Sequence, residues 1–93
     1  MSYNDREYIH APLAKLDYGL DWSLWLKDGE TISTSIWTVE PTLTQSLSQI
    51  RGGITSLFVE GGEINKSYIL TNTITTSTPR IDSRTIKLFC KIR

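Results

Sequence analysis

The single histidine and the single cysteine are the residues of this chain with the most versatile chemistry. His10 and Cys90 could form a base and nucleophile pair, or supply two ligands to a zinc ion. Nucleophilic catalysis requires a rigidly held histidine, but His10 falls in an aperiodic N-terminal segment that we expect to be mobile. One histidine and one cysteine are also too few for a zinc site. The sequence therefore predicts no catalytic residue, no metal ligand and no bound cofactor.

Two other patterns look like functional motifs but are explained more simply by turns. Asp17 and Asp21 flank aromatic residues, and aspartates in such places usually cap turns and do not bind Ca²⁺. Gly61-Gly62 is followed by neither a helical pattern nor a Gly-Lys pair, so it is not a phosphate-binding loop. We therefore expect that the protein is not an enzyme and that it acts through its surface.

The elements that would position such a surface are β-strands, and the C-terminal third shows them best. Residues 68–78 and 85–93 both alternate apolar and polar side chains and are rich in β-branched residues, which is typical of half-buried strands. We expect the two runs to form a hairpin that closes an immunoglobulin-like sandwich. The predicted inward faces carry Tyr68, Leu70, Asn72 and Ile74 in the first run, and Ile86, Leu88, Cys90 and Ile92 in the second.

Turn signals divide the rest of the chain into several more short strands. Asp28-Gly29, Gly52-Gly53 and Gly61-Gly62 separate β-rich runs. Residues 15–93 are therefore predicted to form an all-β, immunoglobulin-like antiparallel β-sandwich of about six to seven strands. The apolar phase changes between Ile36 and Trp37, which predicts either a bulge or partial cover of both faces. The predicted core consists of Leu16, Tyr18, Trp22, Ile32, Leu57, Val59, Tyr68, Leu70, Ile74, Ile86, Leu88 and Ile92.

Residues 1–14 differ from the rest because they are polar and show no regular period. Tyr3, Tyr8 and Ile9 are spaced apolar residues that could dock an extended arm onto a neighbouring protein. The alternative is a tail that lies along its own sheet. We expect an extended N-terminal arm that orders only on assembly.

The charge and cysteine content narrow the possible partners. The chain has 93 residues, the size of one domain, and a net charge of zero, which argues against nucleic acid. Residues 1–63 carry a net charge of −5 and residues 64–93 a net charge of +5, so the halves either neutralise each other or form a dipolar module that meets an acidic partner.

One cysteine allows no internal disulfide, which fits synthesis in a reducing cytosol. We see no signal peptide and no apolar run long enough for a membrane span, and we predict no membrane partner.

Aromatic residues supply the candidates for a contact surface. We expect two of the three tryptophans in the core, with Trp25 at an interface. Phe89 stands in the polar phase of the last strand between Lys87 and Lys91, where it could anchor a partner or pack against a neighbouring strand. We also expect this terminal strand to lie at a sheet edge. The predicted interface residues are Tyr3, Tyr8, Ile9, Trp25, Lys87, Phe89, Lys91 and Arg93.

Two strings of this sequence resemble a family of small tailed-bacteriophage virion proteins. The opening string includes Leu16-Asp17-Tyr18, Asp21-Trp22, Trp25-Leu26, Gly29-Glu30-Thr31-Ile32 and Trp37-Thr38-Val39. The closing string includes Gly61-Gly62, Leu70-Thr71-Asn72-Thr73-Ile74-Thr75-Thr76-Ser77 and Arg84-Thr85-Ile86. The resemblance extends from Leu16 to near the C-terminus and is weak over residues 40–56.

The resemblance implies a structural role in the phage particle. Members of this family are described as fibre-tail adaptors, so it implies a non-enzymatic protein that joins a tail fibre or spike to the tail or connector. The implied partners are other virion proteins, namely tail, connector or fibre subunits, with several copies in each particle after synthesis in the host cytoplasm. Two alternatives stay open: a capsid decoration or cementing protein, and a carbohydrate or cell-surface binding module that uses an exposed tryptophan.

Overall fold

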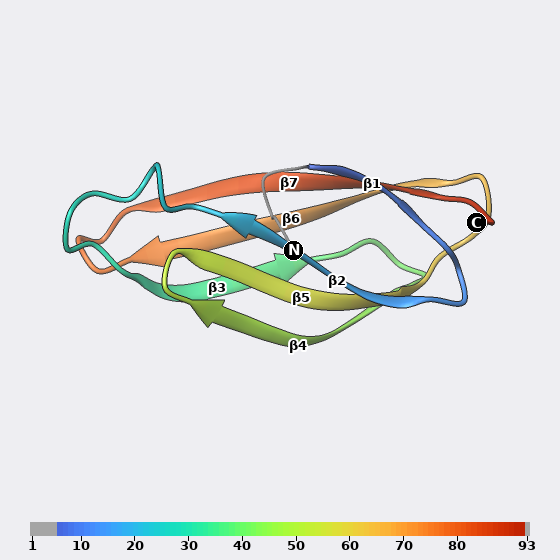
Figure 1. Cartoon of the computed structure of the whole chain (residues 1–93), viewed down its shortest axis with the longest axis horizontal. Helices are drawn as coiled ribbons and strands as arrows, with labels where there is room; N and C mark the ends of the chain where they lie inside the picture. Colours follow the sequence, from blue (N-terminus) through green and yellow to red (C-terminus); the bar gives the residue numbers. More distant parts are fainter. Residues whose placement is uncertain (1–5, 93) are drawn as a thin grey trace.

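The computed structural model describes residues 6–92, and within these residues the chain forms seven β-strands and no helix (Figure 1). The all-β prediction is therefore confirmed, and this part of the chain contains no helix that could span a membrane. The strands are β1 (Glu7–His10), β2 (Lys15–Asp21), β3 (Ile32–Thr38), β4 (Leu43–Arg51), β5 (Ile54–Gly61), β6 (Ser67–Thr76) and β7 (Ile81–Cys90).

The described strands form two layers that enclose one core (Figure 1). Sheet A has the strand order β1-β7-β6-β3, and sheet B has the order β2-β5-β4. Neighbouring strands are antiparallel, except that β1 runs parallel to β7. The predicted hairpin is β6–β7, whose two ten-residue strands are the longest in the described part. Alternation along each strand then separates a buried face from an outward face.

Most of the predicted core is buried between the sheets, and two positions are not. Ile92 was predicted to be buried but is 70% exposed, because β7 ends at Cys90 and the alternation stops there. Leu16 is only half-buried, at the side of the sandwich where β1 and β2 lie. The core also contains Leu20, Trp37, Leu43 and Cys90. The phase change in β3 follows a register shift between Ile32 and Thr34, which leaves Ile36 exposed and Trp37 buried.

Residues 7–10 of the expected extended arm form β1 in sheet A, which agrees with the alternative of a tail that lies along its own sheet. His10 is fully buried, and its Nδ1 lies 2.7 Å from the Tyr18 hydroxyl in β2. Tyr8 also packs against the Tyr18 ring, at a centroid distance of 5.1 Å. This segment lies along its own sheet because alternate side chains enter the core. Tyr3 and the rest of Met1–Asp5 lie outside the described residues.

The prediction that the terminal strand lies at a sheet edge is also wrong. β7 is flanked by β6 on one side and by β1 on the other, in register from Glu7 opposite Lys87 to His10 opposite Cys90. The parallel partner comes from the other end of the chain, so no local pattern around residues 85–93 could reveal it. The backbone of β7 is therefore already paired where β1 covers it.

A buried amide joins the two sheets at the centre of the core. Asn72 in β6 is fully buried, and its Oδ1 accepts hydrogen bonds from Trp22 Nε1 at 3.1 Å and Thr55 Oγ1 at 2.6 Å. Its Nδ2 donates to Ser35 Oγ at 2.9 Å and to the Ile36 carbonyl at 3.2 Å. Because polar groups are buried at little cost only when they are hydrogen-bonded, this network stabilises one register of β6.

An ion pair closes one end of the sandwich, where the β2–β3 loop meets the β6–β7 turn. The Glu30 carboxylate is buried and accepts from Arg80, with Nε 2.9 Å from Oε2 and Nη2 bonded to Oε1. Thr76 and Thr78 also donate to Oε2, each at 2.6 Å. The Arg80 guanidinium, followed by hydrogen bonds from the Lys27 backbone N–H and the two threonine hydroxyls, holds the pKa of Glu30 well below its usual range despite the opposing effect of burial. Arg80 also lies over the Trp25 ring, 3.9 Å from its centroid.

A tyrosine and a glycine hold the opposite end. The Tyr68 hydroxyl accepts a hydrogen bond from the Glu63 backbone N–H at 2.8 Å, five residues upstream, and lies 2.7 Å from Thr42 Oγ1. This resembles the tyrosine corner of immunoglobulin-like sandwiches. Gly62 has φ of +100°, and a Cβ there would lie 2.5 Å from Cys90 Sγ. The turn therefore requires glycine for both its backbone conformation and its close approach to β7.

The buried amide leads to a prediction about stability. Replacing Asn72 with leucine removes the acceptor of Trp22 and Thr55 and the donor to β3, and should lower the free energy of unfolding by about 2–4 kcal/mol. Urea denaturation of the purified chain measures this. Thr73→Val, on the outward face of the same strand, is the matched control and should cost less than about 1 kcal/mol. Equal losses for the two variants would contradict the role given to the network.

The ion pair leads to a prediction about pH. Because the pKa of Glu30 is lower in the folded chain than in the unfolded one, its stabilising effect is fully present above the ordinary glutamate pKa of about 4.3. The effect should be lost progressively as pH falls below that value. Glu30→Gln should therefore lower the melting temperature at pH 7, and the difference from the unmodified chain should shrink between pH 5 and pH 3. A difference that stays constant over that range would show that ionisation of Glu30 is not the cause.

Candidate functional site

The structure brings His10 and Cys90 together, but inside the core. They are register partners on β1 and β7, and both are fully buried. Burial raises the pKa of the Cys90 thiol, which disfavours the nucleophilic thiolate at neutral pH. Among residues 6–92, no group of three or more His, Cys, Asp or Glu residues could hold a metal ion. Asp21 has the predicted turn-capping role, since its Oδ1 accepts from the Ser23 backbone N–H at 2.9 Å.

Two predicted interface residues of β7, Lys87 and Phe89, lie next to the outward residues of β1. Ile9 is opposite Phe89, and Glu7 is opposite Lys87, all on the outer face of sheet A. Ile69 of β6 lies beside Lys87 on the same face. Ile9 is 48% exposed, and Phe89 and Ile69 are each 38% exposed. A depression lined by Ile9, Lys87 and Phe89, together with Glu7, Tyr8 and Ser67, lies on this part of the molecule.

The rest of this outer face is rich in hydroxyl groups and almost free of charge. Across the described strands of sheet A, only two of fifteen outward side chains are charged, Glu7 and Lys87, and these two are cross-strand neighbours. Arg6 lies at the margin, where its Nε donates to the Thr85 carbonyl at 3.0 Å. The outward side chains are Glu7 and Ile9 on β1; Ile81, Ser83, Thr85, Lys87 and Phe89 on β7; Ser67, Ile69, Thr71, Thr73 and Thr75 on β6; and Thr34, Ile36 and Thr38 on β3.

The outer face of sheet B provides an internal comparison. Among its eleven outward side chains in the described strands, five are charged: Lys15, Asp17, Asp21, Arg51 and Glu60. The other outward side chains are Thr44, Ser46, Gln49, Ile54, Ser56 and Phe58. A charged face is suited to solvent, whereas an uncharged face of aliphatic and hydroxyl groups is suited to burial. The two sides of the sandwich therefore differ in the feature that separates solvent-exposed from contact surfaces.

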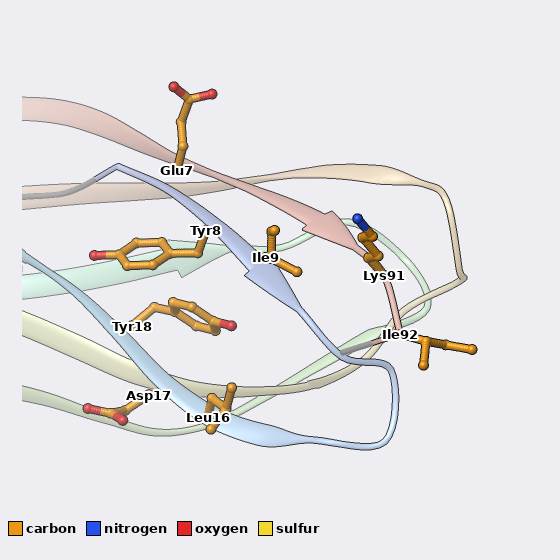
Figure 2. Close-up of a pocket in the computed structure, with 8 residues that line it drawn as sticks. All are labelled: Glu7, Tyr8, Ile9, Leu16, Asp17, Tyr18, Lys91 and Ile92. Atoms are coloured by element: carbon orange, nitrogen blue, oxygen red, sulfur yellow. The ribbon is translucent and has the colours of Figure 1, made fainter.

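A second candidate surface is a groove of about 700 Å³ between the edge strands β1 and β2 (Figure 2). Figure 2 shows the rings of Tyr8 and Tyr18 between the two strands, with Leu16 and Ile92 farther along the groove. Glu7 and Asp17 extend away from the two rings at the borders (Figure 2). The groove is therefore apolar inside, and its lining includes both acids and a base, because Lys91 also borders it. Sequence patterns could not predict it, because it depends on where β1 pairs.

Trp25 occupies a different place from the one expected of an interface anchor. It is half-buried, packs edge-on against the Trp22 ring at a centroid distance of 5.4 Å, and is covered by Arg80. Trp22 and Trp37 are buried in the core, as predicted for two of the three tryptophans. The glycan-binding alternative relied on an exposed tryptophan, but all three tryptophans lie among the described residues and are buried or half-buried.

The acidic and basic halves of the chain interact within the fold. Glu30 pairs with Arg80, and Glu7 lies opposite Lys87 on neighbouring strands. Hydrogen bonds from Ser23 lower the pKa of Asp21, and the positive charge of Arg84 lowers it to a smaller extent. The Arg84 guanidinium lies over the Trp22 ring, 4.2 Å from its centroid. These contacts favour mutual neutralisation over a dipolar module.

The last two predicted interface residues follow β7. The Lys91 backbone N–H donates to the His10 carbonyl at 3.1 Å. Arg93 lies outside the described residues.

Comparisons with known proteins agree with this architecture. The solution structure of the PKD domain from KIAA 1837 protein matches with a TM-score of 0.57 at 15% identity, covering 96% of this chain and 81% of that chain. This supports the predicted immunoglobulin-like sandwich and concerns the fold alone. No curated protein matches the chain.

The model of the family described as "Podophage GP4 fiber-tail adaptor protein gp77" matches residues 10–89, from the end of β1 to the penultimate residue of β7. The chain therefore belongs to the podophage GP4 fiber-tail adaptor protein family.

Proposed function

We propose that this chain is a non-enzymatic virion protein that joins a tail fibre or spike to the tail or connector. The observation that carries the proposal is the family match over residues 10–89, which includes most of both sheets. A rigid sandwich with no metal-binding cluster among residues 6–92 is consistent with a mechanical role. Its partners are then other virion proteins, in several copies per particle, with neither nucleic acid nor membrane, after synthesis in the host cytoplasm.

The outer face of sheet A is the surface that we propose for contact with virion proteins. Phe89 supplies a half-exposed aromatic anchor, and Ile9 and Ile69 extend the apolar area around it. Lys87 and Lys91 lie beside this area and would help to orient a partner. Trp25 is better explained as a support for the β2–β3 loop, because Trp22 and Arg80 cover it. Tyr8 lines the groove between β1 and β2, which is a second possible contact.

The adaptor role predicts the composition of particles that lack this chain. Phage assembled without it should contain capsid and tail proteins but almost no fibre subunits, because the joint between fibre and tail is missing. Quantitative mass spectrometry of purified particles, normalised to the major capsid protein, measures the fibre content. A full complement of fibres on shells that break at lower temperature would contradict the adaptor and support decoration of the capsid.

The contact surface predicts a separation between stability and assembly. Phe89→Ala should reduce incorporation into particles because the aromatic anchor is lost. It should cost the isolated fold only about 1 kcal/mol, since Phe89 is partly exposed. Phe58→Ala is the matched control, an aromatic on the outer face of sheet B that is also partly exposed. Normal incorporation of Phe89→Ala together with a large fall in melting temperature would show that Phe89 serves packing and not assembly.

A further inference from the structure

We propose that the outer face of sheet A packs against the same face of a second copy of this chain, so that the adaptor assembles from face-to-face pairs. The proposal rests on the proposed function only in treating this face as a protein contact within the virion. It goes further by identifying the partner as another copy of the same chain.

The charge pattern of the face fits its own copy. Of the fifteen outward side chains in the described strands, Glu7 is the one acid and Lys87 the one base. In a contact with two-fold symmetry, each surface meets its own copy, and a contact of residue i with j is repeated as j with i. The face therefore has no net charge, so two copies can meet without electrostatic repulsion. A partner of strong positive or negative charge would find no matching field on this face.

The area of the face is sufficient for a specific pair. β6 and β7 each have ten residues, which corresponds to a length of about 33 Å, and four strands span about 15 Å or more. A contact of this size buries roughly 500 Å² on each copy, or about 1,000 Å² in total, the lower limit for a specific interface. We therefore expect a reversible pair in solution that becomes stable when several copies are held together in a particle.

The side chains of the face are suited to packing against another sheet. Ile9, Ile36, Ile69, Ile81 and Phe89 provide apolar area at both ends and on all four strands. The centre carries short hydroxyl side chains, which allow two sheets to approach closely without burying a charge. Thr73 and Ser83 already satisfy each other across β6 and β7, with 2.7 Å between their hydroxyl oxygens. Two such sheets can pack at about 10 Å with their strands roughly aligned.

Sedimentation equilibrium of the purified full chain, from micromolar to several hundred micromolar, tests the proposal. The expected result is a monomer that converts to a dimer as concentration rises. Thr73→Lys places a charge at the centre of the face and should weaken dimerisation at least about tenfold. Ser56→Lys is the matched control, at the centre of the outer face of sheet B, and should leave dimerisation unchanged. A monomer at every concentration overturns the proposal, and so does a dimer that responds to Ser56→Lys but not to Thr73→Lys.

A charge-reversal cycle tests the same contact without relying on one variant. Glu7→Lys and Lys87→Glu should each weaken dimerisation, because each gives both faces a net charge of the same sign. The double reversal should restore dimerisation, because the face is then neutral again. Circular dichroism at each step checks that the variants are folded. Failure of the double reversal to restore dimerisation overturns the predicted contact. If the chain is monomeric but Thr73→Lys prevents fibre attachment, the second copy is the wrong partner and the adaptor role is retained. If the chain dimerises but particles without it keep their fibres, the adaptor role fails and the pair stands.

Discussion

The hydrogen bonds of Asn72 are the constraint on which the arrangement of the sandwich depends. A buried amide must be satisfied on both its oxygen and its nitrogen, and here the partners come from the β2–β3 loop, from β5 in the opposite sheet and from β3. Sliding β6 by one residue would turn Asn72 outward and would bring threonines into the core. The same register that satisfies the amide therefore places Thr71, Thr73 and Thr75 on the outer face of sheet A. The composition of that face follows from an interaction on the opposite side of the strand.

The polar interactions that stabilise the fold lie in the core or at the two ends of the sandwich, away from the outer face of sheet A. Glu30 and Arg80 close one end, and the Tyr68 hydroxyl holds the turn at the other. On the outer face, the hydrogen bond between Thr73 and Ser83 is exposed and contributes little to stability. Substitutions on this face are therefore weakly constrained by folding, yet its described positions carry few charges. A solvated sheet face would be expected to accumulate charged residues, as the outer face of sheet B has done, so contact with another protein is the better explanation.

The parts of the fold that sequence could predict are those whose cause is local. Alternation in β6 and β7 identified the inward residues Tyr68, Leu70, Ile74, Ile86 and Leu88, because a strand reveals its buried face in its own sequence. The position of β1 could not be predicted, since its parallel partner lies about eighty residues away and four residues carry almost no period. For Ile92, the alternating sequence continues but β7 ends at Cys90, whose carbonyl accepts from the backbone N–H of Asn65 in the β5–β6 loop. Glu30 is buried because Arg80 is there, and a charged residue next to Asp28-Gly29 gives no sign of that distant partner.

The free edges of the two sheets bear on how this protein can associate, because the unpaired backbone groups of an edge strand can accept a strand from another protein. Among the described strands, β4 is interrupted between Ser46 and Gln49, where Leu47 adopts a left-handed backbone conformation with φ of 53°. At the neighbouring edge, β3 shifts register near its start, and Gln45 of β4 donates to the Trp37 carbonyl, which occupies an acceptor that an added strand would use. β1 is only four residues long. Short strands, bulges and occupied backbone groups are the devices that prevent uncontrolled edge pairing. The β2 edge of sheet B is the exception, since β2 pairs with β5 without interruption. With the β1, β3 and β4 edges protected, the sandwich is better suited to association through a face than through an added strand, and the nearly uncharged outer face of sheet A is the broadest surface it offers.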